Sequence, residues 1–515
     1  MPLEDPVGEG TRRSTAPRRS YLSVPQRKAQ YAERCLRQGR SIRRAVRVTN
    51  SSTPSDATSP AVRQQLNDLH PSAAPPPFLE EEEAALQLSL EQFQAAVAAI
   101  AAHHRGSAAG PSGWTLEMIC TACQSSDAAT LAVLGVVNLI LSGELPRETF
   151  LLDSNLIGLD KPDGGVRPIA IGEAWYRFAG ICALRECGRD IGAGLAPLQL
   201  GVGTRGGTET VVHALSSALA EGHAVFAIDM RNAFNTVSRQ AILEAVKEHA
   251  APLLPMVQWA YGRPTALHIV GAPPGTPPVM SETGVRQGDP LGPFLFTLAL
   301  QSVLQRVAGG CPDAPLAAYL DDVHIAGSVA AGAAAFRRLC FAPDGVRSIG
   351  LEPRLDKCGV HGGGAGEAAT AAADLGIKDM SRGMTAVGTP LGALEYIDEV
   401  LSARASAVEE QIKVLESLPL SLQSKFLLLR VSMHARMAHL LRTVPRESLE
   451  AHVRRTDMAV YRAVERMFGL PPDVAVWAAG TAADEEQADP CFTPLVNRLH
   501  APLRDGGFGL AVFSR

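Results

Sequence analysis

The fold of this chain is decided by one stretch, Leu316-Ala-Ala-Tyr-Leu-Asp-Asp-Val-His-Ile-Ala326. Apolar runs flank Asp321 and Asp322, and this pattern predicts two strands joined at the acidic pair. Adjacent carboxylates repel each other, whereas a purely structural turn would normally carry Asn or Gly. The stretch therefore predicts a hairpin whose tip has a chemical role.

A second strand points to the same chemistry. Residues 224–229 form a short apolar run that ends in Asp229, which is typical of a buried central strand. If this strand lies beside the hairpin, Asp229 meets Asp321 and Asp322. Phosphoryl transfer to a hydroxyl uses two divalent cations about 3.5–4 Å apart, and Mg²⁺ prefers oxygen ligands. The three acids therefore meet the needs of a site for two Mg²⁺ ions, with Mn²⁺ as an alternative. An acidic pair is also common in solvated turns, so these residues by themselves leave both interpretations open.

Several segments, in this order along the chain, resemble the reverse transcriptases of non-LTR (LINE-type) retrotransposons. They are Gly110-Pro-Ser-Gly113 with Ser112 in place of Asp, Lys161 through Arg167-Pro-Ile169, Asp229-Met-Arg-Asn-Ala-Phe-Asn235, Gly284-Val-Arg-Gln-Gly-Asp-Pro-Leu291 and Tyr319-Leu-Asp-Asp322. Any one of them can arise by chance, but the ordered set is specific. The resemblance covers roughly residues 85–512 and is most specific over residues 155–395.

The resemblance implies roles for further residues. Phe234 would lie under the incoming sugar, where a ring excludes a 2′-hydroxyl. Gln287 would lie near the sugar and base, and Gly288 would let the backbone approach closely. Lys161 and Arg167 would reach the triphosphate. Two further segments match less specifically: Lys357 is expected to protonate the leaving pyrophosphate, and residues 388–392 are expected to form a primer-grip turn.

The expected fold is an α+β right-hand polymerase with fingers, a palm built on an antiparallel sheet, and a helical thumb. We expect a disordered basic arm and linker over residues 1–77, fingers and palm over residues 78–395, and the thumb and a C-terminal segment over residues 396–515. A hairpin is expected, with strands over Leu156–Asp160 and Val166–Ile171 and a turn at residues 162–165. Ser89 begins a capping box, Ser238 can cap a helix, and Asp289 is expected to cap the helix that starts at Leu291. Helices are expected from Tyr396 to about Phe468. Four basic thumb residues can track a hybrid duplex by its backbone or form a solvated helix face, namely Lys425, Arg430, His434 and Arg436.

Composition narrows the class of protein. The formal net charge is −5, so the chain is not uniformly basic. Nearly every charge from Arg12 to Arg47 is positive, which suits phosphate contacts or nuclear import, or else an arm without a special role. No apolar stretch suggests a membrane span, and residues 1–10 do not form a signal peptide. Cys120 and Cys123 lack a second pair for zinc and are expected to be free thiols. A nuclear or cytoplasmic location is inferred from the family.

The resemblance implies an RNA-directed DNA polymerase acting on an RNA template, a DNA primer and deoxynucleoside triphosphates. Another reading is a catalytically silent nucleic-acid-binding relic, or a fragment of a larger element, because no endonuclease domain is recognisable. A group II intron maturase or a viral RNA polymerase is a third reading, though viral RNA polymerases tend to have Gly before the Asp pair. Telomerase would need a large RNA-binding domain before the polymerase. The sequence leaves the oligomeric state open.

Overall fold

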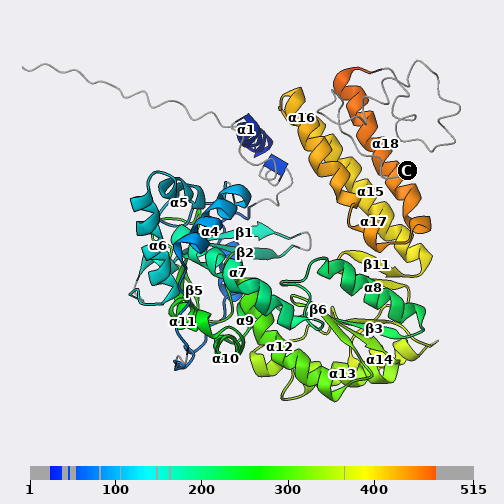
Figure 1. Cartoon of the computed structure of the whole chain (residues 1–515). Coiled ribbons are helices and arrows are strands. Elements are labelled where there is room, and N and C mark those ends of the chain that lie inside the picture. Colours follow the sequence, from blue (N-terminus) through cyan, green and yellow to red (C-terminus); the bar gives the residue numbers. More distant parts are fainter. Residues whose placement is uncertain are drawn as a thin grey trace, which may run out of the picture.

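The computed structural model describes residues 24–37, 45–46, 54–80, 83–104, 106–146, 149–161, 164–364 and 366–470. These residues form three neighbouring parts (Figure 1). A helical part with a small sheet corresponds to the fingers, a five-stranded sheet with flanking helices to the palm, and a bundle of long helices to the thumb. The architecture is the expected α+β right hand.

The palm is built on a sheet of order β6-β7-β3-β8-β9. Its strands are β3 (Ala224–Ile228), β6 (Leu316–Tyr319), β7 (Asp322–Gly327), β8 (Gly359–Gly362) and β9 (Lys378–Asp379). The predicted central strand β3 pairs antiparallel with β7 on one side and with β8 on the other. The β8–β9 pair is parallel, so the expectation of a wholly antiparallel sheet was wrong at that edge.

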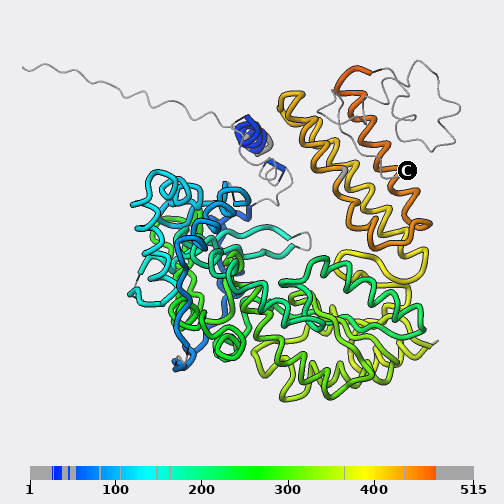
Figure 2. Tube along the Cα trace, viewed as in Figure 1, coloured from blue at the N-terminus to red at the C-terminus, as the bar shows by residue number. Residues whose placement is uncertain are grey.

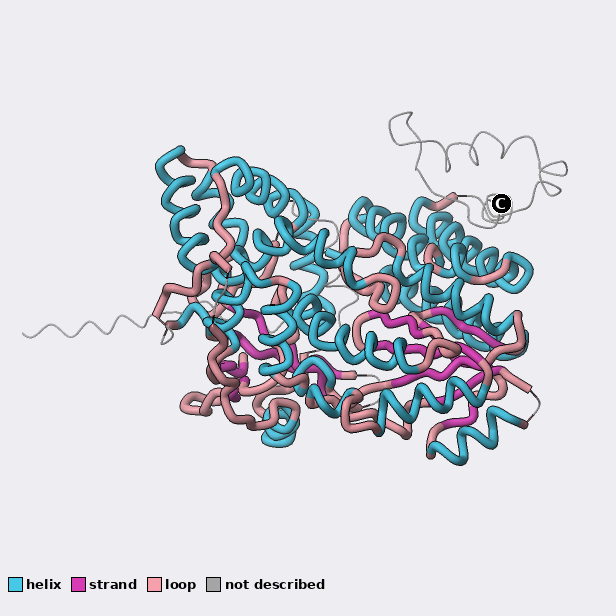
Figure 3. The backbone as a smooth tube through the Cα atoms, turned by 60° about the horizontal axis from the view of Figure 1, so that its bottom comes forward, coloured by secondary structure: helices cyan, strands magenta, loops and turns pink. Residues whose placement is uncertain are grey.

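Helices cover both faces of this sheet because its strands alternate side chains between two apolar clusters. Phe226 and Ile325 belong to a large core on one face of the sheet. Val225 and Ala326 belong to a smaller cluster on the other face, with side chains of α8 (Gly207–Ala220) and of the hairpin over residues 383–392. The palm helices are α8 (Gly207–Ala220), α9 (Ala233–Thr236), α10 (Arg239–His249), α12 (Gly292–Gly310), α13 (Val329–Phe341) and α14 (Glu367–Leu375), with short turns η2 (Ala251–Leu253) and η3 (Val346–Ile349). Figure 3 shows the strands enclosed by helices. Ser238 caps α10 as predicted, since its hydroxyl accepts from the Ala241 amide.

The fingers combine a sheet of order β2-β1-β4-β5 with five helices. The elements are α4 (Leu90–His103), α5 (Leu116–Cys123), α6 (Asp127–Leu141), η1 (Phe150–Leu152), β1 (Ser154–Asp160), β2 (Val166–Gly172), α7 (Ala174–Leu195), α11 (Leu254–Tyr261), β4 (Thr265–Ile269) and β5 (Val279–Ser281). The predicted capping box is present, because Ser89 accepts from the Gln92 amide and the Gln92 side chain accepts from the Ser89 amide. The predicted β1–β2 hairpin is also confirmed, and Pro162 and Asp163 of its turn lie outside the described residues.

The thumb is helical up to Phe468, as predicted. Its elements are α15 (Leu394–Ser417), α16 (Leu422–Leu428), η4 (Leu429–Met433), η5 (His434–Met437), α17 (Leu440–Thr443) and α18 (Arg446–Phe468). The long helices α15 and α18 pack along each other through the apolar side chains of Val408, Ile412, Val460 and Val464. A two-stranded hairpin of β10 (Gly383–Ala386) and β11 (Thr389–Gly392) leads from the palm into α15.

The segment expected to be a disordered arm is partly folded, so that expectation was wrong for residues 24–37 and 54–77. Helix α1 (Val24–Arg37) buries Ala29, Ala32 and Cys35 among thumb side chains. Helix α3 (Pro60–Asp68) buries Leu66 against the fingers sheet. Figure 2 shows this blue segment beside both parts. The sequence of this segment is basic and rich in proline, so its few apolar residues did not predict a folded structure. These residues become buried only against other parts of the protein. Nine of the twelve basic side chains of the arm lie outside the described residues or carry no described side chain. Of the other three, Lys28 is half-buried, and Arg34 and Arg37 are exposed on α1.

Candidate active site

The three predicted carboxylates lie at neighbouring strand ends of the palm. The β6–β7 turn consists of Leu320 and Asp321, since Tyr319 pairs with Asp322. Asp322 is therefore the first residue of β7, not part of the turn as the sequence suggested. Asp229 directly follows β3. Ala227 pairs with His324, so the same ladder brings Asp229 opposite Asp322, on the same face of the sheet.

The charges of these carboxylates influence one another. Burial raises the pKa of Asp229 above its usual range, and Lys357 and Arg354 oppose that effect. Burial also raises the pKa of Asp321, with Asp229 adding to the rise. Burial of its carboxyl group, followed by the charges of Asp321 and Asp229, raises the pKa of Asp322 to about 6. A bound cation would relieve this mutual repulsion.

The donor set fits Mg²⁺ in chemistry, because it consists of carboxylate oxygens from two adjacent strands. In the part of the chain that the structure describes, however, no three His, Cys, Asp or Glu side chains are already gathered closely enough to hold a metal ion. The carboxylates are therefore neighbours that would have to converge on a cation.

The fingers hairpin directs two cations toward these acids. Lys161 follows β1, and its amide donates to the Gly165 carbonyl at 2.7 Å, which closes the hairpin. Arg167 lies on β2 opposite Leu159 and is exposed. Burial raises the pKa of Asp229 and of Asp321, and the charges of Lys161 and Arg167, respectively, oppose these rises. Both cations thus act across the space between fingers and palm.

Phe234 lies at the start of α9, just beyond Asp229. Its half-buried ring stacks on the buried Phe296 ring with centroids 4.7 Å apart. The Phe234 carbonyl accepts from the Val285 amide at 2.6 Å, which joins this segment to the one that carries Gln287. The stacking fixes the ring's position. Its role toward a nucleotide sugar stays a prediction.

Gln287 and Gly288 form a turn that contacts the fingers sheet. The Gln287 carbonyl accepts from the Ala170 amide at 2.7 Å, and the Gln287 side chain is half-buried. Gly288 adopts φ 124°, and a Cβ there would lie 2.4 Å from the Ala170 carbonyl oxygen. The close approach that requires glycine is therefore to the protein's own backbone.

Two charged residues of the same segment are buried. Arg286 pairs with Asp289 at 3.2 Å, and the hydroxyls of Tyr176 and Tyr261 donate to the same Asp289 oxygen at 2.8 and 2.5 Å. The other Asp289 oxygen accepts from the Leu291 amide. Helix α12 begins at Gly292, so the prediction of Asp289 as its N-cap was wrong. The Asp289 carboxylate instead anchors the turn to the core.

Ser112 stands where the resemblance expects Asp. Its hydroxyl donates to the buried Glu173 carboxylate at 2.7 Å, and its amide donates to the other oxygen of Glu173 at 2.5 Å. An Asp side chain at this position would face a second carboxylate. The substitution therefore fits its local partner.

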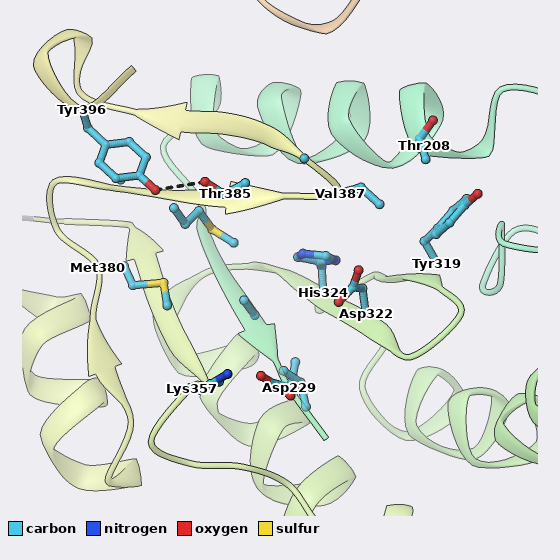
Figure 4. A pocket seen from close by; sticks show the side chains of 15 residues that line it. Thr208, Asp229, Tyr319, Asp322, His324, Lys357, Met380, Thr385, Val387 and Tyr396 are labelled. Atoms are coloured by element: carbon cyan, nitrogen blue, oxygen red, sulfur yellow. Dashed lines mark hydrogen bonds between the residues drawn. The ribbon is translucent and has the colours of Figure 1, made fainter. Parts of the chain in front are cut away.

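A pocket of about 540 Å³ opens beside the carboxylates (Figure 4). Asp229, Asp322 and His324 line one side, with the exposed Lys357 next to Asp229. The β10–β11 hairpin lines the other side, and its turn residues are Val387 and Gly388. The predicted primer-grip segment thus lies across one pocket from the acidic residues.

Thumb contacts hold that hairpin in place. Thr389 is fully buried, and its hydroxyl bonds to His439 Nε2 at 3.1 Å and to the Thr443 hydroxyl at 2.9 Å. Arg442 on α17 forms an ion pair with Glu209 on α8 at 3.0 Å. The thumb is therefore tied both to the β10–β11 hairpin and to α8, whose Thr208 also lines the pocket.

The basic thumb residues are not alike. The Lys425 ammonium group donates to the Glu416 carbonyl at 2.5 Å, near the C-terminal end of α15, so it is engaged within the thumb. Arg430 is half-buried, and its Nε is buried without a hydrogen-bond partner. Arg436 is exposed, whereas the His434 side chain lies outside the described residues, as does the C-terminal segment after residue 470. A shared face for a duplex stays a prediction.

Sequence reasoning missed two buried residues at this site. His324 is 4% exposed and lines the pocket, and burial lowers its pKa to about 4. Its position two residues after Asp322 on a strand was the available signal. Gln199, in the loop between α7 and α8, is fully buried and bonds to Leu320 of the β6–β7 turn. No local pattern marked Gln199.

The fold and the strand-end carboxylates define a right-hand polymerase. Residues 159–358 match the family described as reverse transcriptase (RNA-dependent DNA polymerase). This segment therefore has the sequence features of a reverse transcriptase domain, and the chain is similar to non-LTR retrotransposon proteins.

Two such relatives come from different organisms. The retrotransposable element SLACS 132 kDa protein of Trypanosoma brucei gambiense is 27% identical over 376 residues, which cover 71% of this chain and 30% of that protein. The retrovirus-related Pol polyprotein from type-1 retrotransposable element R2 of Nasonia vitripennis is 25% identical over 440 residues, which cover 79% of this chain and 39% of that protein. The chain thus spans well under half the length of these relatives.

Among solved structures, apo telomerase from Candida tropicalis aligns with a TM-score of 0.40 at 10% identity, covering 63% of this chain and 60% of that one. Telomerase from Candida albicans in complex with a telomeric RNA fragment aligns with a TM-score of 0.38 at 10% identity, covering 70% and 66%. Within the described residues, no helix is long and apolar enough to cross a membrane.

Proposed function

We propose that this chain is an RNA-directed DNA polymerase that adds deoxynucleotides to a primer 3′ end by two-metal phosphoryl transfer. The observation that carries the proposal is the placement of Asp229 opposite Asp322 through the β3–β7 ladder, with Asp321 at the adjoining turn and the Lys161 and Arg167 charges acting on them from the fingers. In such an arrangement the carboxylates can bind divalent ions while the two basic side chains bind the phosphates of a nucleoside triphosphate.

The carboxylates would hold the metal ions. Asp229 and Asp321 would be the main ligands, and Asp322 would support the site. Two Mg²⁺ ions, when bound, activate the primer hydroxyl and neutralise charge on the departing pyrophosphate. The chain's own contribution is to keep the three acids at neighbouring strand ends, from which they would converge on the ions.

The fingers residues would bind the triphosphate. Lys161 and Arg167 lie at the β1–β2 hairpin, and their charges already act on Asp229 and Asp321. Charge-assisted hydrogen bonds from such cations to phosphate oxygens are strong and position the reacting phosphorus. The Gln287 carbonyl bond to Ala170 would couple this hairpin to the nucleotide-binding turn.

The sugar would be selected by Phe234. Stacking on Phe296 prevents the ring from moving aside, so a 2′-hydroxyl would meet a fixed obstacle. Gln287, with Gly288 beside it, would lie near the base and sugar. Lys357 lies exposed beside Asp229, where its ammonium group can give a proton to the leaving pyrophosphate.

The partners would be an RNA template, a DNA primer and deoxynucleoside triphosphates. The pocket between the carboxylates and the β10–β11 hairpin would receive the primer terminus, because it adjoins Asp229 and Asp322. A nuclear or cytoplasmic location stays a prediction from the family, and Mn²⁺ is an alternative ion.

Primer extension tests the proposal. Purified protein is given an oligo(dT)-primed RNA template, deoxynucleotides and Mg²⁺, with Asp321→Asn as the control variant. We expect extension by the natural protein and a loss of at least roughly a thousandfold in Asp321→Asn, which should remain folded. No extension by a folded natural protein that still binds the hybrid would contradict the polymerase and favour a silent binding protein. Normal extension by Asp321→Asn would contradict the metal site.

A further inference from the structure

Gln199 makes an unusual set of contacts for a loop residue. Its side chain is fully buried, and its Nε2 donates to the Leu320 carbonyl at 3.0 Å. Its Oε1 accepts from the Leu320 amide at 2.8 Å and from the Gly201 amide at 3.0 Å. One carboxamide therefore satisfies both backbone groups of the first residue in the β6–β7 turn.

The loop that carries Gln199 continues the palm sheet. Strand β6 is the edge of that sheet, and residues 198–200 lie along its outer side. The Ala318 amide donates to the Leu198 carbonyl at 2.7 Å, and the Leu200 amide donates to the Ala318 carbonyl at 2.7 Å. Beyond Tyr319 the chain turns away, so backbone pairing stops there. The Gln199 side chain takes over the pairing at Leu320.

The turn needs such support because its backbone is strained. Leu320 has φ 59°, a left-handed conformation that is unfavourable for a residue with a Cβ. Such residues persist where surrounding contacts over-determine them. Two hydrogen bonds to a buried carboxamide are contacts of this kind, and they stabilise the strained residue in place. The contacts of Gln199 therefore match the strain at Leu320.

Close packing completes the arrangement. A Cβ at Gly201 would lie 2.6 Å from the Leu320 nitrogen, so the loop can approach the turn only with glycine there. The Leu320 carbonyl that Gln199 holds belongs to the peptide plane leading into Asp321. Fixing this plane fixes the direction from which the Asp321 and Asp322 side chains depart.

We infer that Gln199 is a positioning residue that sets the β6–β7 turn, and through it the placement of the Asp321 and Asp322 carboxylates for catalysis. The inference rests on the proposed polymerase function for its catalytic consequence. Its structural part, the restraint on the turn, does not depend on that function. The expected signature is a lower kcat with little change in substrate binding, because Gln199 itself is buried away from substrate.

The chain offers a matched control. Gln258 on α11 is 2% exposed, and its carboxamide bonds both backbone groups of one residue, accepting from the Leu79 amide at 2.7 Å and donating to the Leu79 carbonyl at 3.0 Å. Gln258→Met thus removes the same type of contact at a place remote from the carboxylates. Met has a similar length and lacks the polar groups.

The experiment compares Gln199→Met, Gln258→Met and the natural protein. Hydrogen–deuterium exchange with mass spectrometry follows the peptide that contains Leu320, and steady-state extension of an oligo(dT)-primed RNA gives kcat and KM for the nucleotide. In Gln199→Met we expect at least about tenfold faster exchange at the turn and a kcat lower by roughly tenfold to a hundredfold. The nucleotide KM and the hybrid Kd should stay within about twofold. Gln258→Met should change neither turn exchange nor kcat.

Each outcome decides the inference. Unchanged exchange at the turn in Gln199→Met would overturn it, and so would an equal loss of kcat in Gln199→Met and Gln258→Met. A higher KM at constant kcat would also overturn it, because it would make Gln199 a binding residue. If the natural protein extends no primer, the polymerase proposal fails separately, and the exchange result alone then decides whether Gln199 restrains the turn.

Discussion

The β6–β7 turn and the β10–β11 turn border the same pocket, and each begins with a non-glycine residue in the left-handed region. Leu320, with φ 59°, is bonded on both backbone groups by Gln199. Val387, with φ 43°, is followed by Gly388 at φ 85°, and the thumb holds the adjoining strand through Thr389. The first turn is restrained from within the palm, whereas the second is restrained by a separate part. We therefore expect the first to be rigid and the second to follow the thumb.

The largest expected effect comes from breaking the first turn. In Gly201→Ala the new Cβ would meet the Leu320 nitrogen at 2.6 Å, so the backbone of the turn must shift. A displacement of about 1 Å at a catalytic group can cost roughly a hundredfold in rate. We expect such a loss of kcat, measured by primer extension. Gly194→Ala is the control, because a Cβ there has nothing within 4 Å. Equal rates for the two variants would contradict a rigid first turn.

The next effect concerns the selection of deoxynucleotides over ribonucleotides, which we expect neither turn to control. We expect Phe234→Ala to admit ribonucleotides, lowering discrimination against them by roughly thirtyfold, or about 2 kcal/mol. The measurement is the ratio of kcat/KM for a deoxynucleotide and its ribonucleotide. Phe341→Ala, which alters an exposed ring on α13, should leave the ratio unchanged. If Gly201→Ala loses discrimination against ribonucleotides and Phe234→Ala keeps it, the β6–β7 turn and not Phe234 selects the sugar.

A smaller effect should follow from straining the second turn. Gly388→Ala places a side chain at φ 85°, at a cost of about 1–2 kcal/mol, while the new Cβ would meet His439 Cδ2 at an ordinary contact distance of 4.0 Å. We expect the KM for primer–template to rise about tenfold while kcat changes little. Gly222→Ala imposes the same strain at φ 83° on a distant turn and should leave the KM unchanged. A fall in kcat alone would show that this turn also positions the chemistry.

The smallest effect is on stability and depends on pH. The pKa of Asp322 is raised to about 6 in the fold, above its usual value of 3.8. Its contribution to stability is thus present at low pH and is lost as pH rises through about 6. Although its carboxyl group lies close to buried neighbours, the residue as a whole remains accessible to solvent, which screens its charge. We therefore expect at most about 1 kcal/mol, or a few degrees in Tm, for metal-free protein between pH 5 and 7.5.

Thermal melting measures this effect with and without Mg²⁺. Added Mg²⁺ should raise the Tm more at pH 7.5 than at pH 5, because protons compete for the carboxylates. Asp322→Asn should reduce both the pH dependence and the response to Mg²⁺. Asp379→Asn, at the far edge of the sheet, should change neither. A response to Mg²⁺ that is equal in both variants would place the ion elsewhere.

The sequence alone was enough to predict the palm strands β3, β6 and β7 and the carboxylates at their ends. The apolar run before Asp229 and the two apolar runs that flank Asp321 have the pattern of buried strands. Such a pattern can be read from neighbouring residues alone, without knowledge of the distant residues that pack against them. The β1–β2 hairpin and the caps at Ser89 and Ser238 were readable for the same reason. The roles of Lys161, Arg167, Phe234, Gln287 and Lys357 came from the resemblance and stay predictions.

Only the tertiary structure decided the rest. The apolar side chains of α1 and α3 are too few to stand out in a basic, proline-rich segment, and they become buried only against the thumb and the fingers. Asp289 resembled a helix cap, yet its carboxylate lies in a buried network with Arg286. Gln199 bonds to a residue 121 positions away. No short sequence window contains such a contact, because its partners meet only after the sheet has formed.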